Sequence, residues 1–188
     1  MFDFVITIEN IMITGSFSEN LDLKATNQKL AGSRYSWKKF PRLSFKLKPL
    51  ATFLMFQSGK FVCTGIKTEA KGKEAITKLL ELLKTEKIVS ENCKFEYCVK
   101  NLVASINIGG ASVSIEQFIT EFDAAYEPEK FPAAIHKLDD TQATFLIFLT
   151  GKLVCSGVST KEELKEVVKK FYSQLKEKNV IQQNLIIN

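Results

Sequence analysis

The side chains that could carry chemistry fall in a segment that occurs twice in the sequence. Residues 53–65, FLMFQSGKFVCTG, return as residues 145–157, FLIFLTGKLVCSG, with eight of thirteen positions identical and four replaced conservatively. Each copy contains a glycine-lysine turn, a cysteine and a hydroxyl residue, groups that could bind an anion, ligate a metal or act as a nucleophile. Because a duplicated segment implies that one chemistry is used twice, these groups are judged as pairs.

Catalysis finds no support in these residues. The only histidine, His136, has no duplicated counterpart, and no pair of carboxylates recurs in both halves. Gly59 and Gly151 fit tight turns and do not form a phosphate-binding loop. The sequence therefore predicts a protein that binds and is not an enzyme, with no catalytic residue.

The four cysteines do not have the pattern of a metal site or of a disulfide framework. Cys63 and Cys155 are repeat equivalents in strand-like segments, and Cys93 and Cys98 lack zinc-type spacing. We expect all four to be buried small apolar residues, in a reducing intracellular compartment, and we expect no metal and no cofactor.

The composition is that of a soluble globular protein. The chain has 188 residues, of which 45% are hydrophobic, so one sizeable domain or two small fused domains can form a core. No apolar run approaches the roughly 20 residues of a membrane helix, and the first ten residues lack a basic start and a cleavage site, so neither export nor membrane insertion is expected. The net charge is +7 for residues 1–95 and −2 for residues 96–188, which makes the first half the candidate for a polyanionic partner.

The duplication extends far beyond the hairpin. Placing the halves in register, with an offset of 91 and later 92, pairs residues from about Ile8 to Leu175 and predicts repeats at 1–93 and 94–188. A first strand in each repeat is followed by a helical or irregular region and three further strands, of which the last two form a hairpin. The expected strands are 4–14, 40–48, 52–57 and 60–64 in the first repeat, and 95–107, 131–138, 144–149 and 152–156 in the second.

Each repeat ends with a helix that has one apolar face. Thr68 is the expected N-cap of the first helix, and Ser159 or Thr160 that of the second. The apolar stripes recur at helical spacing, which predicts that each helix lies on a sheet with its lysines outward. They are Ile76, Leu79, Leu80 and Leu83, and Leu164, Val167, Val168, Phe171 and Leu175.

The predicted strands are apolar on both faces, although two helices can cover only one face of a sheet of about ten strands. Strand residues alternate between faces, so Phe53 and Leu54 point to opposite sides. Either the segments 21–31 and 114–125 cover the second face, or a broad apolar surface is left for a partner.

Several motifs together make the chain resemble the TATA-box-binding protein family over residues 8–176. They are the first-strand motifs at Asn10 and Asn101, the Phe-Pro pairs at Phe40 and Phe131, the two hairpins, and the loop YEPEKF at 126–131. The resemblance implies an α+β saddle of two tandem pseudo-symmetric repeats, with helices on the convex face of a curved antiparallel sheet. It also implies that the concave face binds the minor groove of A·T-rich promoter DNA and bends it, which explains the second apolar face.

The resemblance assigns roles to four sets of residues. The rings that enter base steps are Phe40, Phe56, Phe131 and Phe148. The residues that contact bases or the groove floor are Asn10, Met12, Leu54, Val62, Thr64, Asn101, Val103, Leu146, Val154 and Ser156. Phosphates are assigned to Lys46, Lys60, Lys137 and Lys152. Partner contacts are assigned to Glu127, Glu129 and Lys130.

The resemblance further implies partners and a location. The partners are double-stranded DNA, a general transcription factor IIB-like protein at the second loop, and a transcription factor IIA-like protein whose binding is weakened or specialised. The protein is expected to bind DNA as a monomer, with a homodimer through the apolar face when free, and to lie in the nucleus or at a site of viral transcription. An alternative is a related module that mainly recruits or sequesters transcription factors.

Both repeats depart from the family pattern, and the departures that bear on phosphate contact lie in the second. Ser156 stands where threonine is usual, Asp139 and Asp140 lie in a loop that is normally basic, and Ser159 replaces the lysine found at Lys67 in the first repeat. These replacements predict weaker phosphate contact on the C-terminal side, and the charge asymmetry is expected to orient the protein on DNA or to tune its partners.

Overall fold

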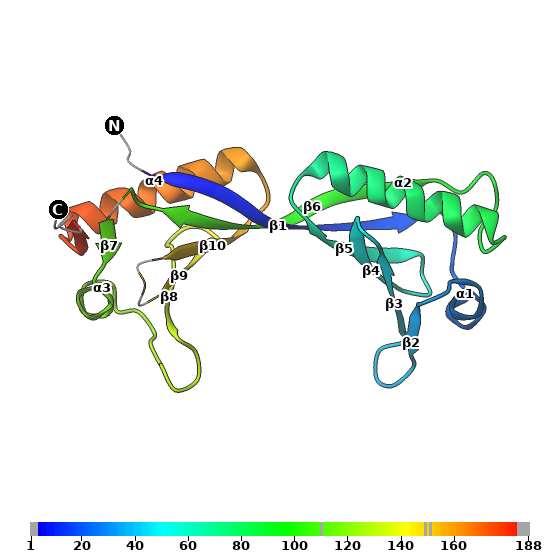
Figure 1. The fold of residues 1–188 in the computed structure, drawn as a ribbon, viewed down its shortest axis with the longest axis horizontal. Helices are drawn as coiled ribbons and strands as arrows, with labels where there is room; N and C mark the ends of the chain where they lie inside the picture. Colours follow the sequence, from blue (N-terminus) through cyan, green and yellow to red (C-terminus); the bar gives the residue numbers. More distant parts are fainter. Residues whose placement is uncertain (1–3, 110, 149, 151, 184–188) are drawn as a thin grey trace. The chain divides into compact units, whose positions relative to one another are not determined.

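The computed structural model describes residues 4–109, 111–148, 150 and 152–183. Its elements in chain order are β1 (Val5–Phe17), α1 (Leu23–Lys29), β2 (Arg34–Ser36), β3 (Arg42–Leu47), β4 (Ala51–Met55), β5 (Lys60–Ile66), α2 (Glu69–Thr85), β6 (Phe95–Asn107), β7 (Ala111–Val113), α3 (Ile115–Phe122), β8 (Ala133–Lys137), β9 (Thr144–Phe148), β10 (Leu153–Val158), α4 (Lys161–Glu177) and β11 (Ile181–Gln183). Residue contacts divide the chain into two compact units (Figure 1). The first unit is residues 10–100, and the second contains residues 1–9 with 101–188.

The first unit is an antiparallel sheet with helix α2 against one face. Its strands follow the order β2-β3-β4-β5-β1-β6. Thr68 caps α2 by accepting a hydrogen bond from the Lys71 backbone N–H, as predicted, and the apolar stripe of the helix is buried. Gly72 lets the helix approach closely, because a Cβ there would lie 2.4 Å from Ile13 Cδ1 and 2.6 Å from Ile66 Cδ1.

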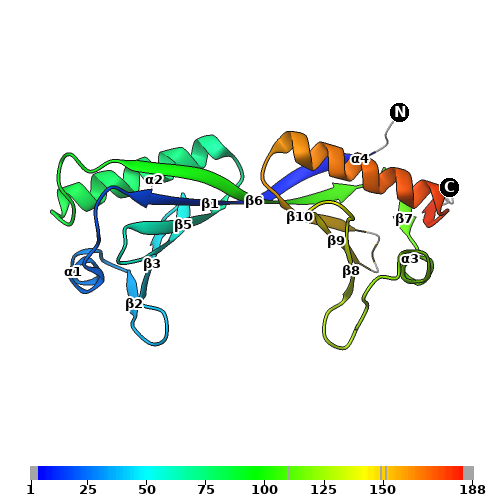
Figure 2. The same cartoon turned by 180° about the vertical axis from the view of Figure 1, so that it is seen from behind.

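The second unit repeats this arrangement with strands β1-β6-β10-β9-β8 and helix α4 (Figure 2). Thr160 is the N-cap of α4, accepting from the Glu163 N–H, while Ser159 donates from its own N–H to the Glu163 carboxylate at 2.8 Å. The two candidates for this cap thus have complementary roles, as in a capping box. A separate two-stranded sheet of β7 and β11 was not predicted.

The expected strands lie within a few residues of the observed ones. Phe40 and Phe131, which we expected to begin strands, lie in the loops just before β3 and β8. Among the described residues the main sheet has nine strands, against about ten expected, and β2 was missed. Leu149 and the turn residue Gly151 lie outside the described residues. The first hairpin is confirmed, with Gly59 at φ +76°.

The prediction that both sheet faces are apolar is confirmed within each unit, and the faces differ in exposure. Phe53, Met55 and Cys63 on the helix-facing side are fully buried. Leu54 and Val62 on the opposite side are only half-buried. The second face therefore remains open to solvent in the described part of each unit.

Three of the four cysteines are buried as expected, but Cys98 is exposed. Its position on β6 alternates to the open face, so the expectation of burial was wrong there. Burial raises the pKa of the Cys63 and Cys155 thiols to about 12, which keeps them protonated and unreactive at neutral pH. In the described chain no helix has the length and apolar character needed to cross a membrane.

Candidate nucleic-acid interface

The open face of the first unit carries a row of side chains that crosses four strands. Strand register places Val62 between Thr14 and Leu54, and Leu54 next to Ser44. A second row lies two residues further along each strand, where Thr64 pairs with Thr52 and Thr52 pairs with Lys46. The first row offers an apolar centre with hydroxyls at its ends, and the second ends in a cation.

The second unit carries the equivalent rows. Val154 lies between Ser105 and Leu146, and Leu146 pairs with Ile135, which is 42% exposed. Ser156, Thr144 and Lys137 form the second row. The structure thus brings together Leu146, Val154, Ser156 and Lys137, as it does their counterparts in the first unit. Thr14 and Ser105 were missed by the sequence reasoning, although period-two alternation from Asn10 and Asn101 would have found them.

Asn10 and Asn101 are held by the same interaction in their respective units. The Oδ1 of Asn10 accepts from the Gly65 N–H at 2.9 Å, and the Oδ1 of Asn101 accepts from the Gly157 N–H at 2.8 Å. Asn10 also exchanges hydrogen bonds with the Thr64 hydroxyl at 3.1 and 3.2 Å. Because a backbone N–H can pair only with the amide oxygen, these contacts fix which amide atom is Oδ1 in both residues, and one Nδ2–H of Asn10 donates to the Thr64 hydroxyl. Their expected position side by side stays a prediction, since the residues belong to different units.

Each hairpin places a phenylalanine opposite a lysine at its tip. The Phe56 N–H donates to the Lys60 carbonyl at 2.9 Å, and the Phe148 N–H donates to the Lys152 carbonyl at 3.0 Å. Both rings are half-buried and both lysines are exposed. A flat ring beside a cation suits a site that takes up a base step and its phosphate.

The other two phenylalanines lie in the loops before β3 and β8. Phe40 is 71% exposed, and Phe131 is 40% exposed. In the second unit the ring centroids of Phe131 and Phe148 are 6.2 Å apart at 62°, so this expected pair forms an edge contact. Met12 and Val103 lie half-buried on β1 and β6, two positions beyond Asn10 and Asn101.

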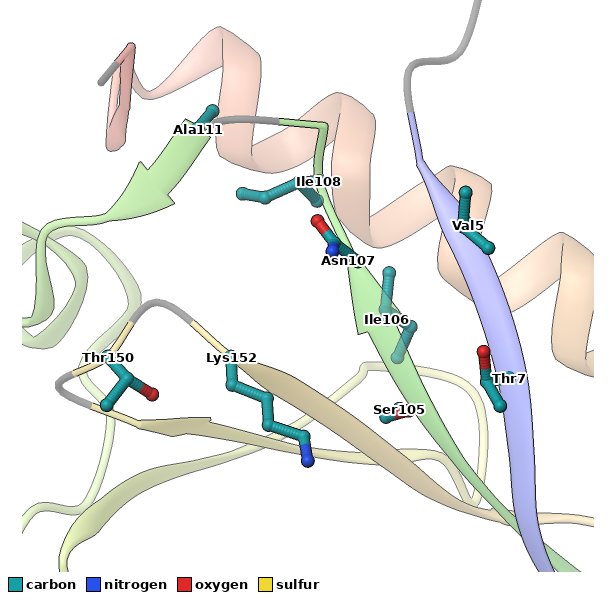
Figure 3. Close-up of a pocket in the computed structure, with 9 residues that line it drawn as sticks. All are labelled: Val5, Thr7, Ser105, Ile106, Asn107, Ile108, Ala111, Thr150 and Lys152. Carbon is teal, nitrogen blue, oxygen red and sulfur yellow. The ribbon is translucent and has the colours of Figure 1, made fainter. Parts of the chain in front are cut away.

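A hollow borders the open face of the second unit (Figure 3). Val5 and Thr7 of β1, Ser105 of β6, and Lys152 line it. A comparable hollow in the first unit lies between Phe56, Lys60 and Glu96.

Two carboxylates on this face were also missed by the sequence reasoning. Glu96 accepts from the Ser16 hydroxyl at 3.1 Å in the first unit, and Glu9 accepts from the Ser105 hydroxyl at 2.7 Å in the second. Such acids repel phosphate, and each accepts the single O–H of its serine. The duplicated pattern gives no signal for them, because Glu9 and Glu96 are not repeat equivalents.

The predicted partner residues lie in the loop between α3 and β8. Glu127, Glu129 and Lys130 are exposed, and Lys130 forms an ion pair with Glu127. The Phe131 N–H donates to the Glu127 carbonyl at 2.9 Å, so the same short turn that displays the acids also positions the ring.

His136 is a structural residue of the second unit. Its ring lies 5.2 to 5.9 Å from the rings of Phe118, Phe122 and Phe171, contributed by α3 and α4. Burial lowers the pKa of His136, with opposing effects from Asp139, which raises it, and Lys178, which lowers it.

Acidification is therefore expected to destabilise this unit through His136. A depressed folded-state pKa means that the unfolded chain takes up the proton first, so stability is full above about pH 6.5 and falls as the pH drops toward the folded-state value. His136→Phe removes this dependence, and the repeat position Phe45 shows that a buried phenylalanine fits the fold. Between pH 7.5 and pH 5.5 the melting temperature should fall further for the wild type than for the variant. An equal fall in both proteins would show that His136 is not the group responsible.

Known proteins are similar in sequence to this chain over almost its whole length. The family described as transcription factor TFIID (or TATA-binding protein, TBP) matches residues 5–85 and 96–178. A TATA-box-binding protein of Methanobrevibacter smithii is 37% identical over 183 residues, covering 96% of this chain and 100% of the relative, and one of Pyrobaculum aerophilum is 38% identical over 178 residues, covering 93% and 87%.

The fold agrees with a solved structure as well. Methanococcus jannaschii TBP superposes with a TM-score of 0.81 and 32% identity, over 92% of this chain and 98% of that one. The fold class that the family resemblance implied is therefore confirmed. The family matches in both repeats, the sequence identity to the relatives and the shared fold all show that this chain belongs to the TATA-binding protein family of transcription factors.

Proposed function

We propose that the chain binds A·T-rich duplex DNA in the minor groove, as a general transcription initiation factor. The carrying observation is the pair of equivalent rows on the open faces, in which Val62 with Leu54, and Val154 with Leu146, are left half-exposed. Apolar side chains suit the floor of an A·T groove, because a guanine amino group there would lose its hydrogen bonds. The Nδ2 group of Asn101, and the second Nδ2–H of Asn10 beside the one given to Thr64, are donors that complement adenine N3 and thymine O2. The family consists of DNA-binding factors, so the expectation that the chain is not an enzyme is confirmed.

Two phenylalanine pairs would kink the bound duplex. In this proposal Phe56 and Phe148 enter base steps from the hairpins, and Phe40 and Phe131 enter the same steps from the loops. Unstacking a step costs a few kcal/mol, which a flat ring partly offsets by its own stacking. Lys60 and Lys152, at the same hairpin tips, would contact the phosphates beside the opened steps.

The exposed loop with Glu127, Glu129 and Lys130 is the proposed surface for a IIB-like factor. A IIA-like factor and a dimer of the free protein through its apolar faces stay predictions. A nuclear or viral location also stays a prediction, and the archaeal relatives, whose cells have no nucleus, give it no support.

The alternative proposal, a recruiting module with little DNA specificity, is favoured by the acidity of the second loop. The recruiting module would show only non-specific affinity for the TATA duplex while still binding the IIB-like partner.

The experiment that tests the proposed function is a binding panel of fluorescently end-labelled duplexes. One carries a TATA element, one carries the same element with G·C pairs substituted singly, and one is a scrambled control. We expect the TATA duplex to bind at least about a hundredfold more tightly than the scrambled one. Log affinity should fall with log salt at a slope of about −4 if the four lysines each contact a phosphate. Equal affinities across the panel would refute the proposal.

A further inference from the structure

The loop between β2 and β3 exposes a large aromatic side chain to which the proposed function gives no role. Trp37 is 68% exposed, close to the 71% of Phe40 in the same loop. In Figures 1 and 2 this loop projects from the side of the first unit's sheet that lies away from α2. A large exposed indole contributes nothing to the core and is typical of a surface that meets a partner.

The surroundings of Trp37 are strongly basic. Between Asp22 and Glu69 the sequence has ten lysines and arginines and no acidic residue. Lys38 Nζ lies 6.0 Å from the centroid of the Trp37 ring, and Arg42 Nη1 donates to the Phe40 carbonyl at 3.3 Å. An aromatic ring with a lysine over it, in a basic stretch of chain, is complementary to a nucleic-acid backbone.

The equivalent loop of the second unit has diverged in the opposite direction. In register, Pro128 replaces Trp37 and Glu129 replaces Lys38. Residues 114–160, the counterpart of the basic run, contain seven acids and three basic residues. Since both loops support the same fold, neither the indole nor the charge is needed for folding, and their presence in one unit points to a contact made by that unit.

We propose that Trp37 is an additional DNA-contacting residue, whose ring packs against the sugar-phosphate backbone beside the base step entered by Phe40. This inference rests on the proposed function. Three residues of extended chain span at most about 11 Å, and stacked bases rise about 3.4 Å each, so the backbone at Trp37 lies within about three base pairs of the backbone at Phe40. The indole side chain can donate a hydrogen bond but cannot accept one, which suits phosphate and sugar oxygens.

Continuity with the rest of the open face favours DNA over an acidic protein as the partner. Arg42 begins β3, the strand that carries Ser44 of the first row and Lys46 of the second. The basic loop thus leads directly into β3, one of the strands that form the proposed groove surface. A separate protein-binding surface would not need this alignment with the DNA rows.

Fluorescence offers a direct test, because Trp37 is the only tryptophan in the chain. Its emission is followed while the full chain is titrated with the TATA duplex, and affinities are measured for Trp37→Ala and Trp37→Phe. The matched control is Pro128→Ala in the second loop. We expect an emission change on binding, about tenfold weaker affinity for Trp37→Ala, and recovery of most of this loss by Trp37→Phe. Pro128→Ala should stay within about twofold of wild type.

A second set of duplexes locates the contact. Shortening the DNA from one end until fewer than three base pairs flank the kinked step should abolish the difference between wild type and Trp37→Ala, whereas shortening from the other end should not. Wild-type affinity in Trp37→Ala, with TATA preference intact, would overturn the inference and leave the proposed function standing. Emission that responds only to an added acidic protein would overturn it in favour of a protein partner. Loss of TATA preference in the wild type would instead refute the proposed function.

Discussion

Replacing Phe56 and Phe148 together by alanine is expected to weaken binding of the TATA duplex about a hundredfold and to remove the bend. Each ring lies on a hairpin tip opposite Lys60 or Lys152, where it can enter a base step. Loss of ring–base stacking costs about 1–3 kcal/mol per base, so two rings give roughly two orders of magnitude in affinity. Binding is measured by anisotropy, and the bend by energy transfer between dyes at the two DNA ends.

The control for this pair is Gln57→Ala, which alters an exposed neighbour of Phe56 in the same hairpin. It should bind and bend like the wild type. A double variant that retains the wild-type energy transfer would show that the rings do not kink DNA, whatever its affinity.

Phe171→Ala is expected to destabilise the second unit by about 3–5 kcal/mol, because it empties the centre of an aromatic cluster. The Phe171 ring stacks on Phe145 with centroids 4.0 Å apart at 20°, and it also contacts Phe118, Phe122 and His136. Its side chain is only 1% exposed, so water cannot easily fill the space that is left. Urea unfolding followed by circular dichroism measures the loss of stability.

Lys165→Ala on the exposed face of the same helix is the matched control and should change stability by less than about 0.5 kcal/mol. A Phe171→Ala variant that loses less than about 1 kcal/mol would mean that the cluster collapses around the cavity and does not depend on this ring.

The helices and hairpins could be predicted because their signals are local. Thr68 and Thr160 cap helices whose apolar stripes are visible in the sequence, and the turn at Gly59 follows from its neighbours. The strands β7 and β11 could not be predicted, since three residues around Ile181 become a strand only by pairing with a segment about seventy positions earlier. Long-range pairing leaves no periodicity in so short a run.

In the candidate site, too, local features could be predicted from the sequence and long-range contacts could not. Alternation along the duplicated strands predicts which of Leu54, Val62 and their equivalents face outward, and the register confirms their rows. The anchoring of Asn10 and Asn101 by glycine N–H groups is a tertiary contact that spacing does not reveal. The same holds for Glu9 and Glu96, whose partners lie about 80 to 96 residues away in the chain.

The division of β1 and β6 between the compact units has a consequence for how the duplicated gene product could diverge. Residues 5–9 of the first strand belong with the second unit, and residues 94–100 of the second repeat belong with the first. A protein cut at the junction of the two repeats would lose a strand segment from the sheet of each unit, so neither repeat contains the whole sheet of its unit. The basic loop of one half and the acidic loop of the other can therefore diverge while both halves stay in one protein.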